Sequence, residues 1–181
     1  FVVLATLNPL ELEATYPLPE AQLDRFFIKL RMDFPSVDEI HTILDRTTYV
    51  DEPAVEPVWD AATILRLREA ALAVPISEAV QDYAIRMIMA TQPSTRFAHE
   101  LTKKYFRYGA SPRGAQALII GGKVRAILGG RAEVAYGDIR HLVLPALRHR
   151  VILNFEGEAE RIDPDTILKS IMESMPEKVM A

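Results

Sequence analysis

The sequence predicts an α/β fragment followed by an all-α helical domain, so that the chain is mainly helical overall. Residues 1–6 and 26–32 are short apolar runs with the composition of buried strands. After Pro35 the apolar residues recur at the spacing of amphipathic helices instead. Because two strands do not form a stable sheet alone, we expect these runs to pair with strands outside this sequence and the chain to be a fragment.

Serine and aspartate residues that suit N-caps delimit the predicted helices. An apolar stripe begins shortly after each of them, and Ser36 has a glutamate three residues later, which is the spacing of a capping box. The helices are expected to begin at Ser36, Asp60, Ser77, Ser111 and Asp138.

Prolines and glycines mark other boundaries of these helices. Pro75 ends the helix that begins at Asp60. Pro112 takes the first position of the helix that follows Ser111, and Gly129-Gly130 ends that helix. The remaining segments are expected to be a loop at 10–19, a short helix at 20–25, an exposed connection at 47–58, an irregular stretch at 92–110, a helix that runs through Arg150, an extended piece at 151–155 and a last helix at about 164–175.

These elements divide the chain into three parts. We expect the C-terminal end of an α/β core over residues 1–34, a helical domain over residues 35–150, and an extension with a final helix over residues 151–181. A length of 181 residues suits one ordinary domain, or a small domain with part of another.

The composition excludes several classes of protein and site. A net charge of -4 argues against a basic surface for nucleic acid over the whole chain. The absence of cysteine excludes disulfides and thiolate metal sites, and it fits a cytoplasmic protein, although secreted bacterial proteins also lack cysteine. The histidines show no metal-ligand spacing with carboxylates. No apolar run approaches the roughly 20 residues of a membrane helix, so we expect a cytoplasmic protein without a membrane segment.

Asn8 follows the first predicted strand, at the end of the strand where open α/β sheets bind their ligands. A side-chain amide there can orient a water molecule or contact a terminal phosphate. The alternative is that Asn8-Pro9 only begins a turn, in which the amide bonds its own backbone.

Two arginines stand at positions that suit anion chemistry. Arg25 precedes the second predicted strand, and arginine is well suited to stabilise charge on a transferring phosphoryl group. The alternative is a surface ion pair with the neighbouring Asp24. Arg113 lies in the first turn of a predicted helix, where its charge opposes the helix dipole but suits a bound anion. The alternative is a solvated arginine.

A basic run, Arg148-His149-Arg150, closes the predicted helix that begins at Asp138. Cations at a helix C-terminus suit the dipole, and this is the interpretation we prefer. Binding of a partner or of nucleic acid is the other interpretation.

These clusters together resemble the MoxR family of AAA+ ATPases. Residues 1–26, FVVLATLNPLELEATYPLPEAQLDRF, are similar to the family's ATQNP run and the E-x-E-G-T-Y-P-L-P-E-A-Q-L-D-R-F that follows it. GASPRG at 109–114 and LPALRHR at 144–150 follow in the family's order, and the resemblance covers most of residues 1–150. The chain departs from the family at Leu7, Leu12 and Ala14, where the family usually has Gln, Gln and Gly.

The resemblance implies a role for each candidate residue. Asn8 is similar to the sensor-1 residue, which positions the attacking water near the γ-phosphate. Arg25 is similar to the arginine finger, which reaches into the site of the neighbouring subunit. Arg113 is similar to sensor 2, which couples the helical lid to the nucleotide state. In this view residues 1–34 end the ATPase core and residues 35–150 form the lid.

The resemblance also implies cofactors and partners. ATP and Mg²⁺ are expected in the intact protein, but the sequence has no G-x-x-x-x-G-K-[ST] phosphate loop and no strand with paired acids for Mg²⁺. Gly121-Gly122-Lys123 lies within a predicted helix and lacks the required spacing. We therefore expect this chain alone to be inactive as an ATPase, with no metal ligands of its own.

The intact protein is expected to be a homo-oligomer, a hexameric ring, that uses ATP hydrolysis for chaperone-like remodelling or metal-cofactor insertion. A protein with a von Willebrand factor A domain is an expected partner. The alternative is a non-catalytic helical interaction module or a degenerate AAA+ subunit. The magnesium-chelatase and DNA-helicase branches fit the motifs less well, and the acidic balance argues against a DNA motor.

Overall fold

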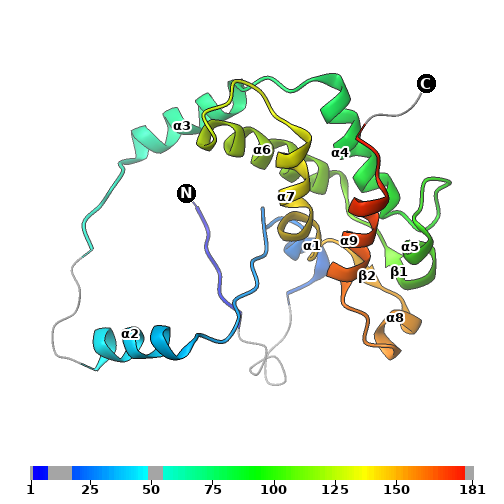
Figure 1. Cartoon of the computed structure of the whole chain (residues 1–181), viewed down its shortest axis with the longest axis horizontal. Helices are drawn as coiled ribbons and strands as arrows, with labels where there is room; N and C mark the ends of the chain where they lie inside the picture. Colours follow the sequence, from blue (N-terminus) through cyan, green and yellow to red (C-terminus); the bar gives the residue numbers. More distant parts are fainter. Residues whose placement is uncertain (1, 8–17, 49–54, 178–181) are drawn as a thin grey trace.

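Helices dominate the computed structural model, which describes residues 2–7, 18–48 and 55–177 (Figure 1). In these residues the helices are α1 Glu20–Leu23, α2 Val37–Thr47, α3 Ala61–Ala73, α4 Glu78–Ala90, α5 Glu100–Tyr105, α6 Pro112–Leu128, α7 Tyr136–Leu147, α8 Phe155–Ala159 and α9 Pro164–Ser174, and the strands are β1 Phe106–Tyr108 and β2 Ile152–Leu153. The mainly helical fold class is confirmed. None of the described helices is both long and apolar enough to cross a membrane.

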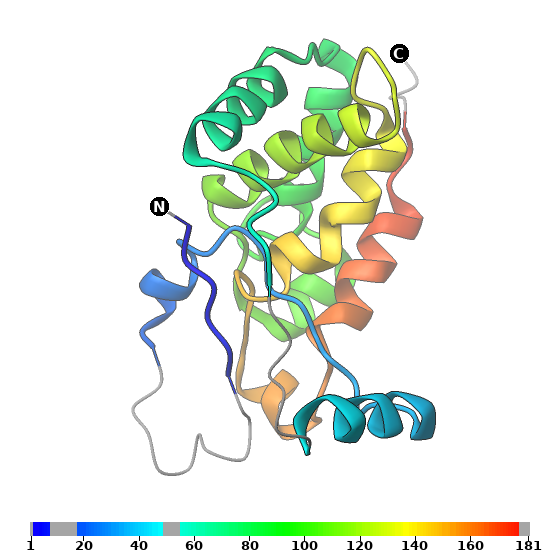
Figure 2. The same ribbon diagram turned by 90° about the vertical axis from the view of Figure 1, so that its left-hand side faces the viewer.

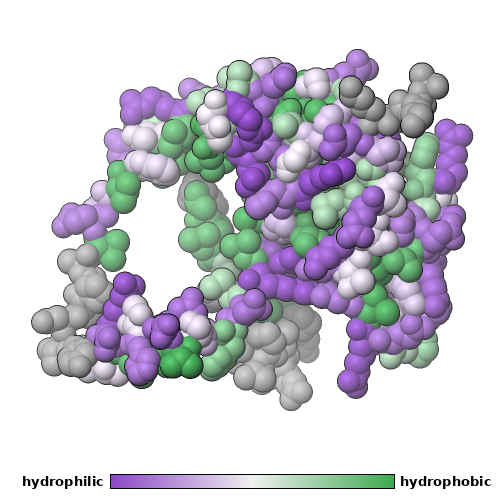
Figure 3. Space-filling model, viewed as in Figure 1, coloured by the Kyte–Doolittle hydropathy of each residue, from purple (hydrophilic) through white to green (hydrophobic). Residues whose placement is uncertain are grey.

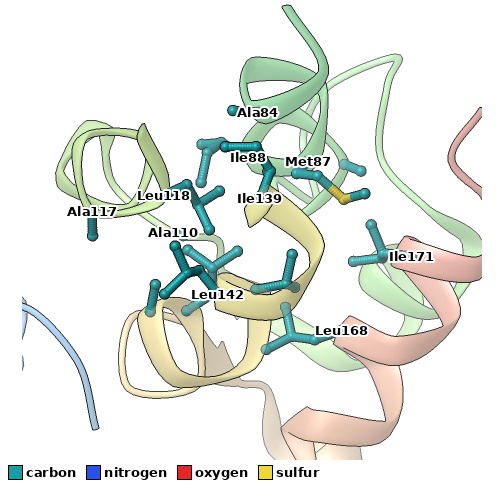
Figure 4. Packing of buried hydrophobic residues seen from close by; sticks show 14 of the residues in the cluster. Ala84, Met87, Ile88, Ala110, Ala117, Leu118, Ile139, Leu142, Leu168 and Ile171 are labelled. Carbon is teal, nitrogen blue, oxygen red and sulfur yellow. The ribbon is translucent and has the colours of Figure 1, made fainter. Parts of the chain in front are cut away.

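The hydrophobic core lies between α4, α6, α7 and α9. Figure 4 shows side chains from all four helices converging on one another. Met87, Leu118, Ile139 and Leu168, one from each helix, are fully buried. Burying a side chain of this size contributes about 1.5–3 kcal/mol, so the four helices stabilise one another as a bundle.

Two glycines allow α6 and α7 to pack closely. A Cβ atom added at Gly121 would lie 2.6 Å from Leu142 Cδ1, and one added at Gly122 would lie 3.2 Å from Ile139 Cδ1. The next residue, Lys123, donates to the carbonyl of Leu72 in α3 at 2.8 Å. The Gly121-Gly122-Lys123 sequence is therefore a helix-packing site, as its lack of phosphate-loop spacing indicates.

The capping residues begin four helices where the sequence predicts them. Ser36 and Glu39 form both hydrogen bonds of a capping box, and Asp60 accepts from the Thr63 N–H at 2.7 Å. Ser77 and Ser111 cap α4 and α6 in the same way. The helix α6 ends at Leu128, just before Gly129-Gly130, where Gly130 has a φ of 64°.

The two predicted strands are not formed in the described residues. Residues 2–7 and 28–36 carry neither helix nor strand, and Leu4 and Met32 are about nine-tenths exposed. A strand exists only through a ladder of hydrogen bonds to a neighbour, and neither segment has such a neighbour within the described part of the chain. This corrects the strand predictions at 1–6 and 26–32 for this structure.

Three boundaries also differ from the prediction. The stretch 92–110, predicted to be irregular, contains α5 and β1, and β1 pairs with β2 in antiparallel fashion. Elements of three to six residues are too short to show a periodic pattern. The helix α7 begins earlier than predicted, at Tyr136, because Asp138 is its third residue and not its N-cap. It ends at Leu147, before Arg150. The Asp138 carboxylate accepts from the Ala135 N–H at 2.9 Å.

The helix α9 packs against α4 and α7, so the end of the described chain is part of the bundle. By contrast, α2 stands apart from the bundle in both ribbon views (Figures 1 and 2). Residues 2–7 are all exposed, and Figure 3 shows hydrophobic surface on the N-terminal part of the chain. The N-terminal part therefore exposes apolar side chains that the bundle does not cover.

Candidate functional site

The candidate site lies where α1 meets the N-terminal end of α6 and the C-terminal end of α7. Of the three residues predicted from the sequence, Arg25 and Arg113 are described by the structure. Asn8 lies outside the described residues. Arg25 follows α1, and Arg113 is the second residue of α6. The segment that carries Arg25 and the helix that carries Arg113 are joined through Asp24.

The GASPRG sequence fixes the start of α6. A Cβ atom at Gly109 would lie 2.2 Å from the Thr91 carbonyl oxygen, so only glycine fits there. The Ala110 N–H donates to Thr91 Oγ1 at 3.0 Å, and a Cβ atom at Gly114 would lie 2.9 Å from Leu147 Cδ2. The loop and the first turn are thus held against the ends of α4 and α7, and this fixes the position of the Arg113 backbone.

The Arg113 side chain is about half exposed, and its Nε atom lies 3.9 Å from an Asp24 carboxylate oxygen. This is a long ion pair, which leaves most of the guanidinium's donors available. Ser111 Oγ caps α6 by accepting from the Arg113 N–H at 3.2 Å. The N–H groups of Arg113 and Gly114 are both bonded to Ser111, so the guanidinium is the donor that this turn leaves available. A cation at the positive end of a long helix suits a bound anion.

Asp24 connects the N-terminal end of α6 with Arg150, which follows α7. Its carboxylate accepts from Ser111 Oγ at 2.9 Å and from Arg150 Nε at 3.1 Å. A hydroxyl has one donor and two acceptor positions, so Ser111 can cap α6 and donate to Asp24 at the same time. The sequence suggested a surface pair between Asp24 and Arg25 as an alternative. In the described structure the Asp24 carboxylate pairs instead with Arg150 and, at longer range, with Arg113.

Arg150 is the buried centre of this connection, with a side chain only 2% exposed. Its guanidinium donates to the carbonyl of Phe26 at 2.6 Å, of Asp24 at 3.1 Å and of Phe27 at 3.2 Å, and also to that of Ala146. Burial lowers the pKa of the Arg150 guanidinium, while Asp24 opposes this effect. Arginine nevertheless keeps its proton in proteins, so the site holds a buried positive charge.

The two residues before Arg150 contact the same segment. His149 Nε2 lies 3.0 Å from the Phe26 carbonyl oxygen, and it must carry a proton to donate there. Burial is the main cause that lowers the pKa of His149, which favours the neutral ring. Arg148 donates to the carbonyl of Lys29 at 3.3 Å and forms a two-point ion pair with Asp165, at 3.2 and 2.8 Å.

The sequence interpretation of this basic run was incomplete. Arg148, His149 and Arg150 follow the C-terminus of α7, whereas the sequence placed them inside the end of that helix. However, their side chains bind the backbone of residues 24–29, which lie more than a hundred positions earlier in the chain. The LPALRHR sequence was a visible signal, but nothing local in it identifies the partner. We refer to Arg148, His149 and Arg150 as the basic clasp.

A second anchor holds the same segment further along. Arg31 donates to both carboxylate oxygens of Asp163, at 2.7 and 2.9 Å. This bidentate contact is the main cause that lowers the pKa of Asp163 to about 2. Both side chains are about half exposed, so the pair adds little stability by itself.

Arg25 differs from its neighbour Asp24 in exposure and in contacts. Among the hydrogen bonds and ion pairs of the described residues, none involves the Arg25 side chain, and the residue is exposed. Asp24 is thus engaged by the bundle, while the neighbouring Arg25 is exposed. In the described ranges no group of three or more His, Asp or Glu side chains is placed to hold a metal ion.

Comparison with protein families places these residues in a known context. Residues 98–171 match the family described as "AAA lid domain". Residues 1–28 match the family described as "ATPase family associated with various cellular activities (AAA)". The first match covers α5 to α9, and the second covers the segment that contains Arg25.

Individual relatives agree with these matches. The chain is 33% identical over 175 residues to "Chaperone MoxR1" of Mycobacterium tuberculosis, covering 97% of this chain and 46% of the relative. It is 28% identical over 189 residues to "Protein MoxR" of Methylorubrum extorquens, covering 96% and 54%. A crystal structure of a candidate ATPase from Cytophaga hutchinsonii superposes with a TM-score of 0.84 at 33% identity, covering 93% and 52%. The chain spans about half the length of these relatives.

Proposed function

The chain belongs to the MoxR family of AAA ATPases and contains its lid domain, and from that premise we propose that it supplies two phosphate-binding arginines to an oligomeric ATPase. Arg25 acts as the arginine finger toward a neighbouring subunit. Arg113 acts as the lid sensor toward the nucleotide of its own subunit. Asn8 acts as the sensor that orients the attacking water.

The observation that carries this proposal is the opposite engagement of two adjacent residues. Asp24 is held by Arg150 and Ser111, whereas Arg25 is exposed and takes no part in these contacts. A finger that acts across a subunit interface requires a fixed backbone and a free guanidinium. The segment after α1 has both properties.

The residues present fit a nucleotide phosphate. The first turn of α6 offers the positive end of the helix dipole and the half-exposed Arg113, which Asp24 approaches only to 3.9 Å. These groups bind and orient negatively charged oxygens and stabilise the charge that develops on them. When bound, ATP with Mg²⁺ supplies the phosphoryl group and neutralises part of its charge. The phosphate loop and the Mg²⁺ ligands are expected from other parts of the intact protein.

We propose the same division of the chain as the sequence predicts. Residues 1–34 end the ATPase core, residues 35–150 form the lid, and residues 151–181 form an extension. The intact protein works as a homo-oligomer, a hexameric ring in the cytoplasm, and couples hydrolysis to chaperone-like remodelling or metal-cofactor insertion. A partner with a von Willebrand factor A domain fits this role.

Steady-state kinetics of the intact protein with Arg25→Ala test this proposal. An arginine finger contributes about 10³- to 10⁵-fold to turnover. We therefore expect Arg25→Ala to lose at least about a thousandfold in kcat, with ATP affinity unchanged in a direct binding titration. Equal turnover in the variant and the wild type would contradict the role of Arg25. A folded wild-type protein with no turnover would favour the non-catalytic interaction module.

A further inference from the structure

We propose that the basic clasp and Asp24 position Arg25, by fixing the segment that carries it to the lid so that the two move as one body. This inference rests on the proposed role of Arg25 as a finger. The residues of the clasp do not touch nucleotide in this proposal. They act through Arg25, and are therefore positioning residues for the reaction.

The clasp takes the place of the backbone ladder that residues 24–29 lack within the described chain. Its three side chains donate to the carbonyls of Asp24, Phe26, Phe27 and Lys29. The backbone also contributes, since the Lys29 N–H donates to the Pro145 carbonyl at 2.8 Å. These six hydrogen bonds to the backbone of residues 24–29 define the path of the chain on both sides of Arg25.

Burial makes this arrangement specific. The Arg150 side chain is almost fully buried and the Arg148 side chain is 12% exposed. A buried guanidinium requires a carboxylate and several acceptors in fixed places, and Arg150 finds them only when residues 24–27 take this path. The burial also argues against the alternative that the run binds nucleic acid, because its charges are not available to phosphodiesters.

Asp24 extends the connection to the sensor. The same carboxylate that pairs with Arg150 accepts from Ser111, the N-cap of α6. The Ser111 hydroxyl therefore joins the Arg25 segment to α6, and it still caps α6 through its acceptor position when that link is lost. Within one subunit, two hydrogen bonds link the segment of Arg25 to the helix of Arg113. Ser111 Oγ donates to Asp24 and accepts from the Arg113 N–H.

The test variant is Arg150→Lys in the intact ATPase. Lysine keeps a positive charge opposite Asp24, but a single ammonium does not reproduce the planar fork that reaches three carbonyls of the segment. We expect kcat to fall by about 10- to 100-fold, the effect of a displacement of roughly 1 Å, with KM for ATP unchanged. The matched control is Asp138→Asn, which removes a buried carboxylate that pairs with Arg131 elsewhere in the lid. It is expected to lower the melting temperature and to leave kcat unchanged when measured well below melting.

Mixed oligomers separate positioning from general damage. Arg113→Ala subunits have a defective site of their own but an intact Arg25. In a mixed oligomer, an Arg113→Ala subunit places its Arg25 correctly in the site of an Arg150→Lys neighbour. That neighbour's site has an intact Arg113. We expect the mixture of Arg113→Ala with Arg150→Lys to be more active than either variant alone. We expect the same of a mixture of Arg113→Ala with Arg25→Ala.

The two mixtures have distinct outcomes. If Arg25→Ala is complemented by Arg113→Ala but Arg150→Lys is not, the positioning role is overturned and the proposed function stands. If neither mixture recovers activity, Arg25 does not act in trans, and both proposals fail. Unchanged kcat in Arg150→Lys alone would also overturn the positioning role.

Discussion

The bundle of α4 to α9 and the N-terminal segment 18–36 are held in different ways. In the bundle, apolar side chains from four helices bury one another, and close contacts such as that of Gly121 with Leu142 leave no alternative packing. Residues 24–31 touch the bundle mainly through arginine, histidine and carboxylate groups that bind backbone carbonyls or one another. The bundle is therefore a self-sufficient unit, whereas the N-terminal segment depends on directional polar contacts that a single substitution can release.

The largest expected effect is on the bundle, at Gly109. A Cβ atom there would lie 2.2 Å from the backbone oxygen of Thr91, so Gly109→Ala forces the backbone before α6 to move. We expect a loss of about 3 kcal/mol in the free energy of unfolding, measured by urea titration. A loss below about 1 kcal/mol would mean that this loop is less tightly packed than the contacts indicate.

Arg150→Ala is expected to release the N-terminal segment without unfolding the bundle. It leaves Asp24 and several carbonyls of residues 24–27 without their donor, at a cost of about 2–3 kcal/mol. Hydrogen exchange measures the effect at the Lys29 amide, which donates to Pro145. We expect faster exchange there and unchanged exchange in α6. Equal acceleration in both places would mean that the two regions unfold together.

Acid is expected to weaken the same attachment by a smaller amount. Burial lowers the pKa of His149 in the folded protein below its value of about 6.5 in the unfolded chain. Its neutral form therefore stabilises the fold above pH of about 6.5, and this contribution is lost as the pH falls below that value. Asp24, Lys29 and Arg150 also act on this ring, the first raising its pKa and the other two lowering it.

The measurement is exchange at Lys29 between about pH 7 and 5, corrected for the intrinsic pH dependence of exchange. A His149→Gln variant keeps a neutral donor and should lose the pH dependence. The pair of Arg31 and Asp163 serves as an internal reference, because the Asp163 pKa of about 2 keeps that carboxylate charged throughout this range. A pH dependence that persists in His149→Gln would assign the effect to another group.

The smallest expected effect is a gain of stability in the bundle. Gly137 lies in the first turn of α7, and a Cβ atom there would meet nothing within 4 Å. Gly137→Ala should stabilise the bundle by about 0.5–1 kcal/mol by restricting the unfolded chain. It is the matched counterpart of Gly109→Ala in the same urea titration. A loss of stability would show that the start of α7 is more crowded than described.

The difference between local and long-range contacts explains which features could be predicted from the sequence. The helices that begin after Ser36, Asp60, Ser77 and Ser111 were predicted because a cap and its helix are neighbours in the chain. Arg113 was located in the first turn of its helix for the same reason. The contact of Asp24 with Arg150 could not be predicted, since the two residues are 126 positions apart.

The strands predicted at the N-terminus failed for a further reason. Their apolar residues were identified correctly, and Phe27, Ile28 and Leu30 remain exposed in the described structure. Whether such a run becomes a strand depends on a hydrogen-bonded neighbour, and the run itself does not supply one. The role of Arg25 likewise depends on a second subunit, and this is why it stays a proposal.

The most direct test of this role is the steady-state ATPase rate of the intact protein as a function of its concentration, with Arg25→Ala measured alongside. If Arg25 completes the site of a neighbouring subunit, the activity per subunit rises with concentration as oligomers form, and Arg25→Ala stays near zero throughout. An activity per subunit that is independent of concentration and equal in the two proteins would contradict a trans-acting Arg25.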